Sequence, residues 1–177
     1  DQHKLYFHKL GTSQEKDKLI FGGTPEEKNR YVRGFVTNDN RFLIIDAAKR
    51  TSGNKLFIKD LKNSSEIKTI VNDYDSNTSL IDNLGSKLFL FTDDNSPNNR
   101  VVTVDFGDLN KSNWKDFIAE SDFVLSLSKA GGFFFAKYMV DAISKVYQYD
   151  YKGNLLREIN LPGIGTASGF SAKNNQK

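Results

Sequence analysis

A hydrolytic site would be built from serine, histidine and aspartate side chains, and the sequence does not place these in a suitable pattern. The only histidines are His3 and His8, whereas a nucleophilic hydrolase needs a serine, a base and an orienting acid within reach of one another. The segment nearest to a G-x-S-x-G nucleophile elbow is GTASG at residues 165–169, which has Ala167 in the central position. We therefore assign no catalytic residue, and we interpret His8 as a side chain of the first strand, on an outer blade.

One acidic loop approaches the pattern of a metal site. Asp73, Asp75 and Asn77 follow the first half of a calcium-binding loop, but Thr78 stands where the loop needs glycine and Leu84 where it needs a bidentate glutamate. The sequence contains no cysteine, which excludes thiolate nucleophiles and zinc–thiolate sites. We assign no metal and no cofactor, and we predict a solvated turn at this loop.

The most regular acids in the sequence are Asp60, Asp105 and Asp150, which recur at a spacing of 45 residues. Each lies within one of three similar segments, KLFIKDL, RVVTVDF and KVYQYDY. A second set, RFLII, KLFLF and GFFFAK, precedes them with a spacing of 45 or 46 residues. One aspartate per repeat at a strand end is typical of a turn. We therefore interpret the three aspartates as turn residues and not as a functional ring.

The repeat predicts an all-β fold. Each repeat has four short runs rich in Val, Ile, Phe and Tyr, separated by Asn, Asp, Ser and Gly, which is a strand pattern without helical periodicity. Four antiparallel strands per unit of this length are typical of a β-propeller blade. A β-sandwich or barrel is the alternative, and the constant spacing argues against it. The predicted partial propeller divides into 1–24 (end of a blade), 25–72, 73–120 and 121–163 (three blades), and 164–177 (start of the next blade, with a strand over Ala167–Ser171).

Length and composition limit what such a chain can do. It has 177 residues, 38% of them hydrophobic, with 14 Phe and 7 Tyr, so it should fold. Its net charge of +3 and its short apolar runs argue against nucleic acid and membrane partners. Three and a half blades cannot close a ring, because propellers have typically four to eight. We therefore expect part of a longer protein, whose open end blades promote self-association.

Four segments together resemble one protein family. They are KLYFHKLGT at residues 4–12, TSGNKLFIKDL at 51–61, NSPNNRVVTVDF at 95–106 and YDYKGNLLREINLPGIGTASGF at 149–170. In this order they resemble the N-terminal propeller domain of the prolyl oligopeptidase (prolyl endopeptidase) family. The likeness extends over nearly the whole chain, from Lys4 to about Phe170.

This resemblance implies a seven-bladed propeller that covers an α/β-hydrolase domain of the same polypeptide. That domain carries a Ser-Asp-His triad and cleaves oligopeptide substrates after proline, while the propeller acts as a size filter. All of its catalytic groups would lie outside this chain, which should be inactive alone. In some members the loop that matches Ala47 to Asn54 approaches the substrate cavity. Arg50 is thus a candidate contact for a peptide carboxylate, with an exposed loop cation as the alternative.

A second function remains open for a propeller of this kind. It is a scaffold that binds proteins or ligands and has no peptidase domain, because propellers serve many unrelated functions. The repeats lack the Gly-His and Trp-Asp signatures of WD blades, which argues against that reading. The composition suits a bacterial protein of either the cytoplasm or the periplasm.

Overall fold

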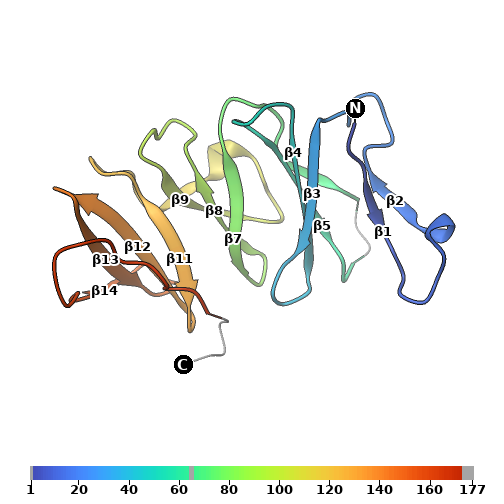
Figure 1. The fold of residues 1–177 in the computed structure, drawn as a ribbon. Helices are drawn as coiled ribbons and strands as arrows, with labels where there is room; N and C mark the ends of the chain where they lie inside the picture. The colour runs from blue at the N-terminus through green and yellow to red at the C-terminus, as the bar shows by residue number, and fades with distance from the viewer. Residues whose placement is uncertain (1, 64–65, 173–177) are drawn as a thin grey trace.

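The computed structural model describes residues 2–63 and 66–172 as a row of antiparallel sheets stacked face to face (Figure 1). A two-stranded sheet comes first, with β1 (Leu5–Phe7) and β2 (Lys18–Phe21). Three four-stranded sheets follow, each with its strands in chain order; they are called the first, second and third sheets below. The first sheet contains β3 (Tyr31–Val36), β4 (Phe42–Ala48), β5 (Lys55–Asp60) and β6 (Lys68–Val71). The second contains β7 (Thr78–Leu84), β8 (Lys87–Thr92), β9 (Arg100–Asp105) and β10 (Lys115–Ile118). The third contains β11 (Ser126–Ala130), β12 (Phe133–Val140), β13 (Ile143–Tyr149) and β14 (Leu155–Glu158).

This arrangement confirms the predicted all-β fold with four antiparallel strands per repeat. Two single turns of 3-10 helix, η1 (Gln14–Lys16) and η2 (Lys111–Asn113), are the only helices among the described residues. None of the helices in this part of the chain has the length and hydropathy that a bilayer crossing requires.

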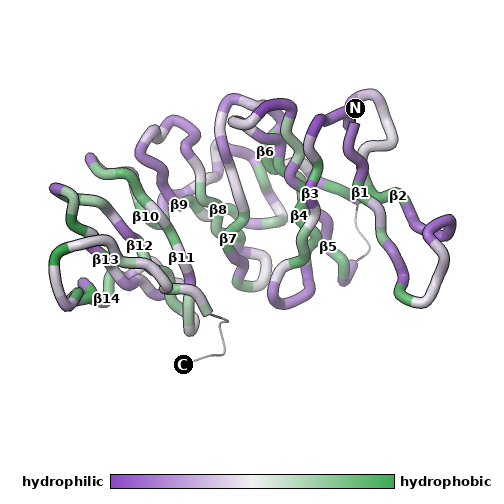
Figure 2. Tube along the Cα trace, in the orientation of Figure 1, coloured by the Kyte–Doolittle hydropathy of each residue, from purple (hydrophilic) through white to green (hydrophobic). Residues whose placement is uncertain are grey.

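The core lies between the sheets, so the central strands are buried on both faces. Phe42, Ile44 and Ile45 of β4 are all fully buried, which explains why this strand has a continuous apolar run instead of alternation. Ile44 packs toward the second sheet, whereas Ile45 packs toward β1 and β2. Hydrophobic residues accordingly follow the strands, and hydrophilic residues occupy the loops at the two rims of the stack (Figure 2).

The second and third sheets are joined by aromatic and ionic contacts. Phe89 of β8 is fully buried, and its ring centroid lies 5.1 Å from that of Phe134 on β12 and 5.3 Å from that of Tyr151. The Tyr151 hydroxyl donates to the carboxylate of Asp82, and the Lys129 ammonium lies 2.9 Å from the same carboxylate oxygen. Residues distant in sequence therefore fix how these sheets stack.

The repeated aspartates are turn residues, as predicted. In Asp60, Asp105 and Asp150 the side-chain Oδ1 accepts a hydrogen bond from the backbone N–H two residues later, at 2.7–2.9 Å. This Asx-turn geometry satisfies backbone donors where the strand ends. The constant spacing of the aspartates thus reflects the same Asx turn, which follows the third strand of each four-stranded sheet.

Two predicted strands differ from the structure. The strand predicted over Ala167–Ser171 does not form, because the backbone-to-backbone bonds to the third sheet come only from flanking residues: the N–H of Ser144 donates to the carbonyl of Gly165 at 3.0 Å and that of Ala172 to the carbonyl of Lys129 at 3.2 Å. The sequence pattern also predicts a strand from Trp114 to Ala119, but Trp114 ends the turn η2, where its N–H donates to the carbonyl of Lys111, and β10 begins only at Lys115. Its indole packs against the core between the first and second sheets.

Candidate substrate-facing hollow

The loop that contains Arg50, residues 49–54, joins β4 to β5 and is fastened to the segment that leads into the second sheet. Asn54 donates from its side-chain amide to the carbonyl of Thr78 at 2.9 Å, and its side-chain oxygen accepts from the Thr78 N–H at 2.8 Å. The N–H of Gly53 donates to the side chain of Asn77 at 2.9 Å. Buried Asn54 therefore holds the loop in one position against the neighbouring sheet.

Gly53 is required at this junction for two reasons. Its φ of +75° lies in the left-handed region, which favours glycine. A Cβ atom at this position would also lie 1.8 Å from the carbonyl oxygen of Tyr74. The loop and the connecting segment can approach one another so closely only because residue 53 has no side chain.

A polar hollow of about 290 Å³ opens between this loop and β3. Its floor and walls come from the edge strand β3, the adjacent end of β4, the loop and the start of the second sheet. The lining residues are Tyr31, Arg33, Asp46, Ala48, Arg50, Thr51, Gly53, Asn54 and Asn77. The structure thus brings Arg50 together with a second arginine, Arg33, and with one carboxylate, Asp46.

The electrostatics of the hollow are dominated by its two guanidinium groups. The Arg33 and Arg50 side chains form no hydrogen bond or ion pair within 4.0 Å with the residues that the structure describes. Arg33 faces Asp46 as its cross-strand partner. Burial raises the pKa of the Asp46 carboxyl, and the positive charge of Arg33 opposes that rise. The lining of the hollow therefore contains two guanidinium groups and one carboxyl group.

Two lysines near the hollow are directed elsewhere. Lys49 and Lys55 both lie over the ring of Tyr74, with Nζ 4.9 Å and 5.3 Å from its centroid. Lys55 also donates to the side chain of Asn72 at 3.0 Å. The cations available inside the hollow are thus Arg33 and Arg50, and not the neighbouring lysines.

Arg33 was not identified from the sequence as a site residue. In the sequence, Arg33 looks like any exposed cation on an edge strand. Only the pairing of β3 with β4 places it opposite Asp46. Cross-strand pairs of opposite charge are a recognisable feature once the register is known. The residue-by-residue register of this strand pair is the signal that could have identified Arg33.

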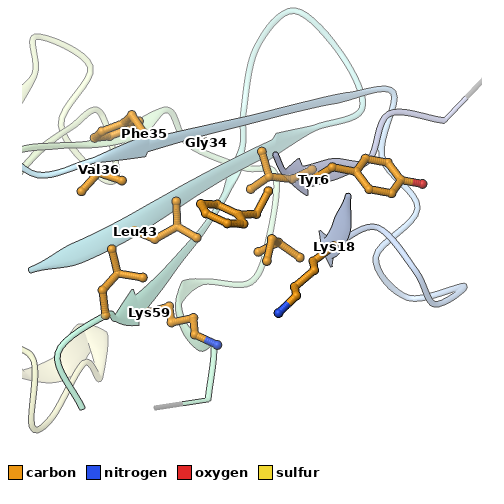
Figure 3. A pocket seen from close by; sticks show the side chains of 11 residues that line it. Tyr6, Lys18, Gly34, Phe35, Val36, Leu43 and Lys59 are labelled. Atoms are coloured by element: carbon orange, nitrogen blue, oxygen red, sulfur yellow. The ribbon is translucent and has the colours of Figure 1, made fainter. Parts of the chain in front are cut away.

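An apolar groove of about 720 Å³ lies between the two-stranded sheet and the first sheet (Figure 3). Phe35 and Val36 of β3, and Tyr6 and Phe7 of β1, line it and remain 43–57% exposed. β1 has β2 as its only partner within residues 2–63 and 66–172. The groove offers apolar surface and a free strand edge, and the polar groups of its lining are those of Tyr6, Lys18 and Lys59.

The remaining candidates from the sequence do not assemble into a reactive site. The prediction that His8 is a strand residue is wrong, because β1 ends at Phe7. The Nδ1 atom of His8 is instead 2.6 Å from the Asp17 carboxylate, a partner that the sequence did not suggest. No serine completes this pair among the described hydrogen bonds of His8. Asp73 accepts from the N–H of Asp75 and from the ammonium of Lys111, which is the predicted turn. Within the described ranges, no three acidic or histidine side chains are grouped as metal ligands.

Comparison with protein families gives a match along the whole chain. The model for the "Prolyl oligopeptidase, N-terminal beta-propeller domain" matches residues 1–177. The chain belongs to the prolyl oligopeptidase family. It corresponds to the propeller domain, which is not the catalytic domain, and the four-stranded sheets are propeller blades of that domain.

Relatives in this family are named for cleavage at proline. The chain is 48% identical to the prolyl endopeptidase of Elizabethkingia miricola over 177 residues. The alignment covers 100% of this chain and 25% of that protein. The chain is 30% identical to prolyl oligopeptidase A of Galerina marginata over 92% of this chain and 23% of that protein. The chain therefore spans about a quarter of the length of these relatives.

Solved structures of the family have the same fold. Prolyl oligopeptidase B from Galerina marginata, bound to a 35mer hydrolysis and macrocyclization substrate, matches 99% of this chain with a TM-score of 0.84 and 25% identity, over 25% of that chain. The same protein without a ligand matches 98% of this chain with a TM-score of 0.82 and 26% identity, over 25% of that chain. The partial propeller predicted from the repeat is confirmed.

Proposed function

We propose that the chain forms part of the propeller of a serine peptidase that cleaves short peptides after proline. The observation that carries this proposal is the 48% identity to a prolyl endopeptidase along the entire chain. The propeller supplies a wall that admits an extended oligopeptide and rejects a folded protein. The α/β-hydrolase domain of the same polypeptide supplies the nucleophile, base and acid, so the chain alone is inactive.

A chromogenic peptide with a single proline tests this proposal. We expect the full-length protein to release the chromophore and an active-site serine reagent to abolish that release, while purified residues 1–177 release none. Turnover by residues 1–177 alone would refute the assignment of catalysis to another domain. A full-length protein without prolyl peptidase activity would instead favour the second candidate, a binding propeller, and its reading frame should then lack a G-x-S-x-G segment.

We propose further that Arg50 contacts the peptide substrate from the wall. Its place on a fastened loop beside the polar hollow supports this role. Arg50→Ala should raise KM for an oligopeptide and leave kcat nearly unchanged, because the contact would bind ground state and transition state alike. An unchanged KM would identify Arg50 as an exposed loop cation.

The blade divisions are also a proposal. We place them after residues 24, 72, 120 and 163, giving the units 1–24, 25–72, 73–120, 121–163 and 164–177. Each four-stranded sheet lies between two of these positions, which supports the division. Limited proteolysis should cut in the connecting segments near these positions before it cuts within a sheet.

The chain on its own should self-associate through the apolar groove beside β1. Exposed Phe35 and Phe7, together with a free strand edge, support this proposal. Light scattering of residues 1–177 should show dimers or larger species, and Phe35→Asp should reduce their mass. Leu10→Asp is the matched control, since Leu10 is 90% exposed and does not line the groove. A monomer at tens of micromolar would contradict this proposal.

A further inference from the structure

The polar hollow has the size and charge of a site for one end of a peptide. Ligand pockets for whole small molecules have volumes of roughly 300–1,000 Å³, and the hollow has about 290 Å³. It therefore suits a single terminal residue or end group. Two arginines and one aspartate leave an excess of positive charge at its mouth.

Arginine is well suited to bind a carboxylate, because its planar guanidinium donates two parallel hydrogen bonds. Arg33 and Arg50 come from different elements, β3 and the loop after β4, and both line the same hollow. Neither guanidinium forms a hydrogen bond or an ion pair within 4.0 Å among the described residues, although the charge of Arg33 acts on the Asp46 carboxyl. Asp46 lies opposite Arg33 in the strand pair and is the only carboxylate that lines the hollow.

The site is also preorganised. Asn54 and Gly53 bind the loop of Arg50 to the segment that contains Asn77, and Arg33 stands on a strand paired through all six of its residues with β4. A carboxylate binding here would not have to order a flexible loop, so little affinity would be lost to conformational entropy.

We propose that Arg33 and Arg50 bind the C-terminal carboxylate of a peptide in this hollow, so that the wall selects peptides with a free carboxyl end. The inference rests on the proposed peptidase function and deepens it by naming a feature of the substrate. The same chemistry could come from an acidic side chain near the peptide end, and the experiment distinguishes the two sources.

The experiment compares two peptides with one internal proline, identical except for a free carboxylate or an amide at the C-terminus. We expect the full-length protein to cleave the free acid with the higher kcat/KM. Arg33→Ala should lower kcat/KM for the acid about tenfold more than for the amide, the factor of one charge-assisted hydrogen bond, and mainly through KM. Arg33→Lys should restore part of the difference, because it keeps the charge without the planar fork.

Lys49→Ala is the matched control, because Lys49 follows the same strand but lies over Tyr74 and does not line the hollow. It should leave the ratio of acid to amide unchanged. An amide peptide that ends in glutamate tests the side-chain source, and its cleavage at the rate of the acid would overturn the assignment to the terminal carboxylate. Equal cleavage of acid and amide by the unmodified protein would overturn the proposal altogether.

Calorimetric titration keeps the proposal testable without peptidase activity. A peptide without proline, as the free acid and as the amide, is titrated into the full-length protein. We expect tighter binding of the acid and loss of that difference in Arg33→Ala. If neither peptide with proline is cleaved but the acid still binds selectively, the peptidase proposal fails and the carboxylate site stands. Equal binding of acid and amide refutes the site.

Discussion

At the scale of single residues, Gly53 determines how closely the Arg50 loop can approach the second sheet. A Cβ atom there would lie 1.8 Å from the carbonyl oxygen of Tyr74, and the φ of +75° is strained for alanine. We expect Gly53→Ala to lower the free energy of unfolding by roughly 3 kcal/mol, from strain and from displacement of the loop. Urea denaturation of the purified protein measures this.

Gly85→Ala is the control for backbone strain alone. Gly85 has a φ of +60°, but a Cβ atom there would meet nothing within 4 Å. Its substitution should cost only about 1 kcal/mol. Equal losses in the two variants would show that the close approach of the loop to Tyr74 contributes nothing to stability.

The turn aspartates predict how stability depends on pH. A hydrogen bond from the Asn154 side chain, followed by one from its N–H, lowers the pKa of the Asp150 carboxyl below its usual range. The Ser86 hydroxyl and the N–H of Gly107 lower the pKa of Asp105 in the same way. These donors bind the carboxylate, so they favour the ionised form in the folded protein.

We therefore expect Asp150 to stabilise the folded state above about pH 4, the pKa of an unfolded aspartate. This stabilisation should disappear as the pH falls through the lowered folded-state pKa, because the unfolded chain then binds more protons. Asp150→Asn should lower the urea midpoint at pH 7 and have a smaller effect near pH 3. Asp122→Asn, at an exposed residue, should change neither midpoint. A pH-independent loss in Asp150→Asn would contradict this account.

At the scale of strands and sheets, the sequence predicted most of the fold, because the repeat places a strand wherever an apolar run meets a turn. It failed where structure depends on contacts and not on residue type. The run at Trp114 looks like a strand, but Asn110 accepts from the N–H of Ser112 and the chain forms the turn η2 first. Residues 167–171 contain Phe170 as their only strand-favouring residue, and the segment has no neighbouring strand with which to form a ladder.

The stacking of the second and third sheets depends on Phe89. Its ring lies 5.0–5.3 Å from the rings of Phe117, Phe134 and Tyr151, and its side chain is fully buried. We expect Phe89→Ala to destabilise the protein by about 3–5 kcal/mol, because the cavity would open between two rigid sheets. Thermal unfolding monitored by near-UV circular dichroism reports the loss.

Phe123→Ala is the matched control, since Phe123 is 40% exposed and does not line the groove beside β1. It should cost less than about 1 kcal/mol. Comparable losses in Phe89→Ala and Phe123→Ala would mean that the aromatic cluster between the sheets is not what holds them together.

At the scale of the whole molecule, a row of stacked sheets is a wall whose rigidity resides in the contacts between sheets. The Asp82 carboxylate and the Lys129 ammonium, 2.9 Å apart, come from the second and third sheets, and Tyr151 donates to the same carboxylate. The sequence could not predict this group, because the three residues are brought together only by stacking. This group of three residues lies where the second sheet would separate from the third.

If the wall acts as the size filter of the proposed peptidase, loosening this contact should change which substrates enter. We expect Lys129→Met, which leaves the buried Asp82 carboxylate without its ammonium partner, to raise kcat/KM for a long unstructured peptide relative to a short one a few fold. Lys152→Met removes an equal charge from an exposed turn and should leave the ratio unchanged. If Lys129→Met lowers stability but the two peptides keep their ratio, long substrates enter by a route that does not require these sheets to separate.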